Sequence, residues 1–105
     1  MYKYMLAYHG GHQPTTREES LAHQTQWKEW IAKHGDIIVN AGTPLMESTL
    51  VTSTSVMKED DPDAMNGFTV IQVESLDKAI EIAKSDPFLM IGGTIRVSRM
   101  MEMSQ

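Results

Sequence analysis

The pattern that most constrains the fold is one long amphipathic helix over residues 15–35, TTREESLAHQTQWKEWIAKHG. Thr15 or Thr16 can cap its start through a side-chain oxygen, and Gly35 is expected to end it in the left-handed conformation. At about 100° per residue, bulky side chains gather on a stripe about 100° wide, which is typical of a buried face. The stripe consists of His23, Trp27, Trp30, Ile31 and His34.

Strand-like segments flank this helix and a second one. We expect strands at residues 2–8, 37–39, 67–74 and 94–101, because these segments are short and rich in β-branched or aromatic residues. The second helix is expected over 76–84, with an apolar stripe made of Leu76, Ala79, Ile80 and Ala83. The order β-α-β-β-α-β predicts an α+β, ferredoxin-like fold with both helices on one face of an antiparallel sheet.

Two further stretches are less regular. Residues 45–57 have strand composition and are interpreted as a continuation of the second strand or an irregular excursion beside it. Residues 58–66 are interpreted as a solvated acidic turn, because they lack the spacing of a calcium loop.

The sheet face opposite the helices also carries apolar residues, so we predict a symmetric homodimer in which two sheets pack as a sandwich or barrel.

The charge and composition exclude several classes. The chain of 105 residues is expected to form a single domain, 1–105. Its net charge of -5 without a basic cluster argues against binding to nucleic acid. The absence of cysteine excludes thiolate metal sites and fits a cytoplasmic location. No segment has the ~20 apolar residues that cross a membrane, and the start does not resemble a signal peptide.

His23 is the first candidate for catalysis, because an imidazole can take up and release protons near neutral pH. The structural alternative is a half-buried histidine that hydrogen-bonds to backbone. His9 and His12 could hold a transition metal, but no third ligand is evident, so we expect no metal and a mobile loop there. Trp27 and Trp30 are expected in the core, and one of them could line an apolar substrate pocket.

The chain resembles the YCII-related family, which includes proteins once called DGPF proteins. Five segments carry the resemblance: YKYMLAY (2–8), the helix from His23 to Ile31, NAGTPL (40–45), the strand, helix and D-P-F ending of 66–88, and GGTIRV (92–97). The chain departs from the DGPF branch by lacking that tetrapeptide, and the insert of residues 48–66 is longer than in the shortest members.

The resemblance implies a dimeric α+β barrel and an enzyme that uses a His–Asp pair without a cofactor. Carried over by position, the pair is His23 and Asp86. Tyr4 and Tyr8 are expected in the same cleft and join the tryptophans as candidate pocket residues. In this plan we expect the two helices to run parallel to each other, which would place the pair roughly 15 Å apart. Contact through water or through the second subunit, and Tyr4, Tyr8 or Asp36 as other partners of His23, therefore remain open.

Some members of the family act on ring compounds, by elimination of halide or isomerisation of lactones. The resemblance therefore implies a small cyclic or aromatic substrate and acid–base chemistry. Two alternatives stay open: a non-catalytic dimeric module that binds a small ligand, and a cofactor-free monooxygenase or haem-handling barrel. Asp86 also has a structural alternative, because Asp-Pro is a common signal for the end of a helix.

Overall fold

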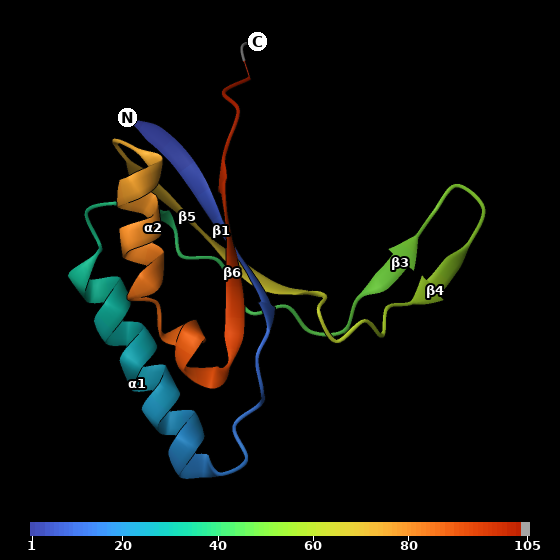
Figure 1. The fold of residues 1–105 in the computed structure, drawn as a ribbon. Helices are drawn as coiled ribbons and strands as arrows, with labels where there is room; N and C mark the ends of the chain where they lie inside the picture. The colour runs from blue at the N-terminus through green and yellow to red at the C-terminus, as the bar shows by residue number, and fades with distance from the viewer. Residues whose placement is uncertain (104–105) are drawn as a thin grey trace.

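The computed structural model describes residues 1–103. Its sequence of elements includes two α-helices, one short 3-10 helix and six strands (Figure 1). In chain order they are β1 (Tyr2–Gly10), α1 (Arg17–Lys33), β2 (Ile38–Asn40), β3 (Thr49–Val51), β4 (Val56–Lys58), β5 (Met65–Val73), α2 (Leu76–Lys84), η1 (Pro87–Ile91) and β6 (Gly93–Arg99).

Four of the strands form one antiparallel sheet with the order β2-β5-β1-β6. The central strand β1 pairs with β5, where Tyr4 lies opposite Ile71, and with β6, where Leu6 lies opposite Val97. Both helices lie on the same side of this sheet (Figure 1). The predicted α+β, ferredoxin-like architecture is therefore confirmed.

The core lies between the sheet and the two helices. Alternate residues of a strand point to the same face, so Tyr4, Leu6 and Tyr8 of β1 face the helices together. They pack with Ile71 and Val73 of β5 and with buried side chains of the helices, namely Trp30, Ala79, Ile82 and Ala83. The chain thus buries one continuous apolar layer, and this layer fixes the helices over the sheet.

The ends of α1 agree with the sequence at one end and differ at the other. The Thr16 side chain caps the helix by accepting a hydrogen bond from the Glu19 amide at 3.0 Å, as the sequence predicts. The prediction that Gly35 ends the helix in the left-handed conformation is wrong, because Gly35 does not adopt a positive φ. The helix ends at Lys33, and the amide of His34 closes the last turn by donating to the Trp30 carbonyl.

The helices run in opposite directions, which corrects the parallel arrangement assumed from the sequence (Figure 1). In an antiparallel sheet with the order β2-β5-β1-β6, β1 and β5 point in opposite directions. The helix that follows each strand therefore also points the opposite way. As a result α1 packs against η1, just beyond the end of α2, and the estimate of 15 Å between His23 and Asp86 loses its basis.

Two further segments differ from their predicted form. In α2 the buried residues are Ala79, Ile82 and Ala83, whereas Leu76 and Ile80 of the expected stripe are exposed. Residues 45–57 do not extend β2. They contain β3, which pairs with β4 in a separate two-stranded sheet that projects away from the helices (Figure 1).

Candidate functional site

Asp86 is the most deeply buried carboxylate in the described part of the chain, with an exposed fraction of 2%. It caps η1, because its Oδ1 accepts a hydrogen bond from the Phe88 amide at 2.9 Å. Its Oδ2 accepts a hydrogen bond of 2.6 Å from the hydroxyl of Tyr8, which lies 78 positions earlier in the chain. Both oxygens of this carboxylate are therefore held by donors in an otherwise apolar layer.

The Tyr8 hydroxyl continues a line of hydrogen bonds across the sheet. It lies 2.8 Å from Oγ1 of Thr69 on the neighbouring strand, and Thr69 donates to the Ala41 carbonyl at 3.2 Å. Thr69 is fully buried. Sequence reasoning missed this residue, because a threonine within an apolar strand is ordinary strand composition.

His23 lies on the inward face of α1 and is half-buried. Its Nδ1 is buried and has no hydrogen-bond partner among the described residues. No direct hydrogen bond joins it to Asp86 within residues 1–103. A charge on His23 is the smallest of the influences that lower the pKa of Asp86, after the hydrogen bonds from Tyr8 and the Phe88 amide.

Aromatic side chains surround the Tyr8 end of this group. The ring of Tyr8 meets that of Trp27 edge-on, with 5.7 Å between the ring centroids. Its centroid lies 5.0 Å from the centroid of the Phe88 ring. Trp27 in turn stacks on Trp30 at 5.3 Å. Of the four predicted pocket residues, Tyr4, Tyr8 and Trp30 are buried in the core, whereas Trp27 is half-buried beside Tyr8.

The pKa values of Asp86 and Tyr8 reflect their burial. Loss of hydration raises the pKa of Asp86 above its ordinary value, while the hydrogen bonds from Tyr8 and the Phe88 amide and the charge of His23 oppose that rise. Burial, followed by the nearby charge of Asp86, raises the pKa of the Tyr8 hydroxyl, so that this group stays a proton donor. Tyr8 therefore keeps its proton and holds the Asp86 carboxylate in place as a hydrogen-bond donor.

We expect Tyr8→Phe to lower the free energy of unfolding by about 1–3 kcal/mol at pH 8, because it leaves a buried carboxylate oxygen without its donor. The loss should be smaller at pH 4. Removal of the hydroxyl raises the folded pKa of Asp86 further above the unfolded value near 3.9, so stability is lost as pH rises through the folded pKa. Urea unfolding at both pH values measures the difference.

Tyr4→Phe is the matched control for this prediction. Tyr4 lies on the same face of β1 and is equally buried, but within residues 1–103 its hydroxyl makes no hydrogen bond to a carboxylate. Its effect should be independent of pH. Equal pH dependence in the two variants would show that the Tyr8–Asp86 bond does not set the proton affinity of the carboxylate.

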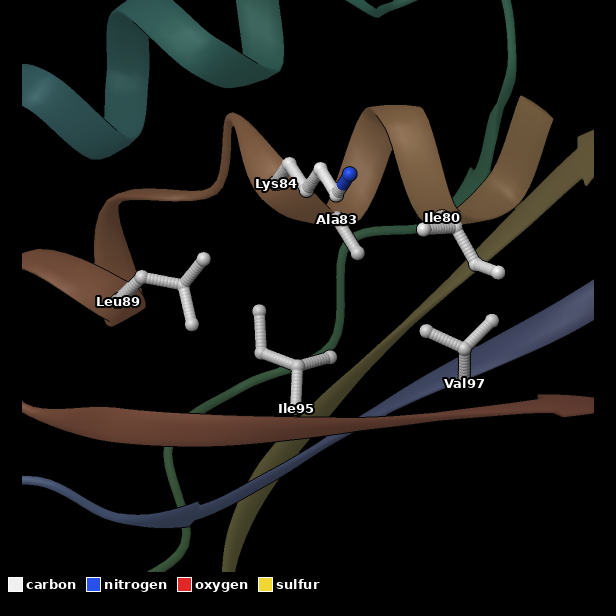
Figure 2. Close-up of a pocket in the computed structure, with 6 residues that line it drawn as sticks. All are labelled: Ile80, Ala83, Lys84, Leu89, Ile95 and Val97. Atoms are coloured by element: carbon white, nitrogen blue, oxygen red, sulfur yellow. The ribbon is translucent and has the colours of Figure 1, made fainter. Parts of the chain in front are cut away.

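A mainly apolar groove lies next to this group but does not contain it. A groove of about 370 Å³ opens between α2 and β6 (Figure 2). It is lined by Ile80, Ala83, Lys84, Leu89, Ile95 and Val97. Ala83 and Lys84 precede Asp86 in the chain and Leu89 follows it, so the turn that carries the carboxylate forms one end of the groove.

The two histidines of the predicted loop are placed differently from each other. His9 lies within β1 and is buried, and its Nδ1 is 2.9 Å from the Asp63 carbonyl, so the strand extends further than predicted. The backbone of His12 donates to the Ile91 carbonyl at 2.9 Å.

Residues 1–103 contain no group of three or more metal-ligating side chains in a suitable arrangement. None of the helices described is long and apolar enough to span a membrane.

Comparison with known proteins agrees with this architecture. The structure is similar to that of the 5-chloro-2-hydroxyhydroquinone dehydrochlorinase TftG from Burkholderia phenoliruptrix AC1100, solved in complex with 2,5-dihydroxybenzoquinone. The TM-score is 0.57 and the sequence identity 18%, over 94% of this chain and 93% of the other. At this identity the likeness shows a shared fold. No curated protein sequence matches the chain. A model of the YCII-related domain matches residues 1–104, so the chain belongs to the YCII-related family.

Proposed function

We propose that this protein is a small enzyme that removes a proton from a cyclic or aromatic substrate, in an elimination or an isomerisation. The observation that carries the proposal is the group formed by the buried Asp86 and Tyr8 and the half-buried His23. A carboxylate with 2% exposure is costly to maintain in an apolar layer. Such groups are concentrated at functional sites, where their charge acts on a neighbouring acid or base.

In the proposed mechanism, His23 accepts the proton, because its buried Nδ1 lacks a partner within residues 1–103. The negative charge of Asp86 stabilises the imidazolium that forms. Tyr8 and the Phe88 amide hold the carboxylate in place. In an elimination, the C–H electron pair forms the new double bond while a halide leaves. In an isomerisation, His23 returns the proton to a different atom of the substrate.

The substrate class rests on chemistry and on the structural neighbour. Trp27, half-buried beside His23 on the same face of α1, offers an aromatic surface to a planar ring. The neighbour TftG is a dehydrochlorinase of a chlorinated hydroxyhydroquinone, which is an elimination from a ring compound. We therefore propose halogenated hydroquinones and lactones as the first substrates to examine, and a homodimer as the active form.

The coupling between the two residues can be tested before any substrate is known. We expect His23→Gln to raise the pKa of Asp86, because the imidazolium charge lowers it in the native protein. A carbon-13 NMR titration of the Asp86 carboxyl group measures this change directly. His34→Gln is the control, since His34 lies on the same face of α1 and beside Trp30 but does not influence Asp86. An unchanged Asp86 titration in His23→Gln would remove the support for a His–Asp pair.

A further inference from the structure

The β3–β4 hairpin forms an arm, defined here as residues 45–58, that its own chain leaves uncovered. All six strand residues of the arm are exposed. Among them the apolar side chains of Val51 and Val56 have exposed fractions of 67% and 70%. No charged residue occurs from Ser48 to Met57. Edge strands of natural proteins are normally protected by charges or proline, so this arm has the features of a strand that pairs or packs elsewhere.

The size of the molecule supports this view. An isolated two-stranded hairpin is at best marginally stable in water. The chain exposes 7711 Å² of surface, whereas a compact monomer of 11.8 kDa exposes about 5,900 Å². Its radius of gyration is 15.2 Å, against about 13 Å for a compact chain of this length. The excess surface of about 1,800 Å² is more than the ≈ 800 Å² that each partner buries in a standard protein interface.

The same chain carries a surface of matching chemistry. In the groove between α2 and β6, aliphatic side chains of the helix face those of the strand (Figure 2). β6 is an edge strand, so one side of its backbone has no partner strand in the described sheets. The acidic segment 59–63 that follows the arm is engaged within its own chain, because Asp63 pairs with Arg96 of β6 at 3.3 Å, so the match between arm and groove is one of apolar side chains.

The arm cannot reach this groove within its own chain. It leaves the sheet beside β2 and β5, whereas β6 forms the opposite edge, and it projects away from the helices that border the groove (Figure 1). A second copy of the chain offers the groove instead. If two sheets face each other about a two-fold axis parallel to the strands, the β2 edge of one lies over the β6 edge of the other.

We propose that the arm of one copy packs into the α2–β6 groove of a second copy, and that the second arm does the same in return. Such a reciprocal contact closes with two-fold symmetry and uses each arm and each groove once. It covers the exposed apolar residues of the arm together with Ile80 and Leu89 of the groove. The inference concerns assembly and does not rest on the proposed activity.

Crosslinking between single-cysteine variants tests the contact, because the native chain has no cysteine. Val51→Cys and Leu89→Cys are prepared separately, mixed to allow subunit exchange, and treated with a short bis-maleimide. We expect a covalent species of twice the 11.8 kDa chain mass in the mixture. The control mixture pairs Val51→Cys with Gln24→Cys, an exposed position on the outer face of α1. Equal yields in the two mixtures would overturn the proposal.

Sedimentation provides an independent measurement of the assembly. We expect the native chain to sediment at twice its mass at micromolar concentration, and the variant Val51→Glu/Val56→Glu to dissociate at least 10-fold more readily. Both valines are exposed within one chain, so circular dichroism should show an intact fold. A native protein with the mass of one chain would contradict the inference. So would a dimer that the double variant leaves unchanged, because its interface would then lie away from the arm.

Discussion

His23→Gln is expected to reduce turnover by about 10²–10⁴-fold while leaving the fold intact. This is the usual contribution of a positioned general base. Glutamine fills similar space, but it cannot accept a proton from carbon. Proton NMR in heavy water with halogenated hydroquinones or lactones measures the effect, because removal of a carbon-bound proton leads to elimination or to incorporation of deuterium. The rate constant is compared at saturating substrate, so that binding and chemistry are separated.

Two further variants make this result specific. Asp86→Asn keeps the shape of the side chain and removes its charge, so we expect it to lower turnover as well while binding of the substrate persists. His34→Gln, at the end of the same helix, should retain the native rate, because His34 contacts Trp30 and Ser85 and makes no hydrogen bond to Asp86 within residues 1–103. If His23→Gln binds and converts the same ring compound at the native rate, the acid–base proposal is wrong.

Gly42→Ala is expected to destabilise the fold by about 3 kcal/mol or more, which would lower the melting temperature by about 10 °C or more. Gly42 adopts a φ of 70°, a conformation that costs other residues roughly 1–2 kcal/mol. In addition, a Cβ at this position would overlap the backbone carbonyl oxygen of Phe68. The segment around Gly42 and strand β5 would have to separate. This would also strain the hydrogen bond that Thr69 donates to the Ala41 carbonyl.

Gly35→Ala is the control for this substitution. Gly35 has no positive φ, and its added Cβ would lie 3.5 Å from the nearest atom, the Ile31 carbonyl oxygen, which is an ordinary contact. We expect little change, or a gain of about 0.4–1 kcal/mol from the lower entropy of the unfolded chain. Thermal unfolding of both variants measures the difference. Similar stability of the two variants would mean that the chain passes Phe68 less closely than the structure shows.

The sequence predicted the elements of this fold well, because their signals are local. The stripe that contains His23 and Trp30 requires only the helical period. The cap at Thr16 requires a hydroxyl next to the first turn of the helix. Local signals of this kind failed where they were compatible with more than one strand pairing. Threonine, serine and valine in residues 45–57 indicated strands, but their composition did not indicate which strand they would pair with.

In the candidate site, too, the sequence indicated which residues matter, whereas strand pairing decided how they are arranged. Sequence patterns and family resemblance could select His23 and Asp86, but they could not place them relative to each other, because their separation depends on the direction of two helices. That direction follows from strand pairing, which joins β1 to β5 and β6. The bond between Tyr8 and Asp86, and the position of Thr69 beneath it, follow from the same pairing.

The sequence by itself therefore determined where the two helices and the strands of the main sheet form, and which face of α1 is turned inward. These properties depend on neighbours within one or two turns or a few residues along a strand. Only the tertiary structure decided that Trp30, in the last turns of α1, donates to Ser85 at the end of α2. It also decided that Tyr8 reaches a carboxylate 78 positions away and that the arm stands apart from the sheet (Figure 1). These contacts depend on the burial of one apolar layer by the whole chain, which no local pattern contains.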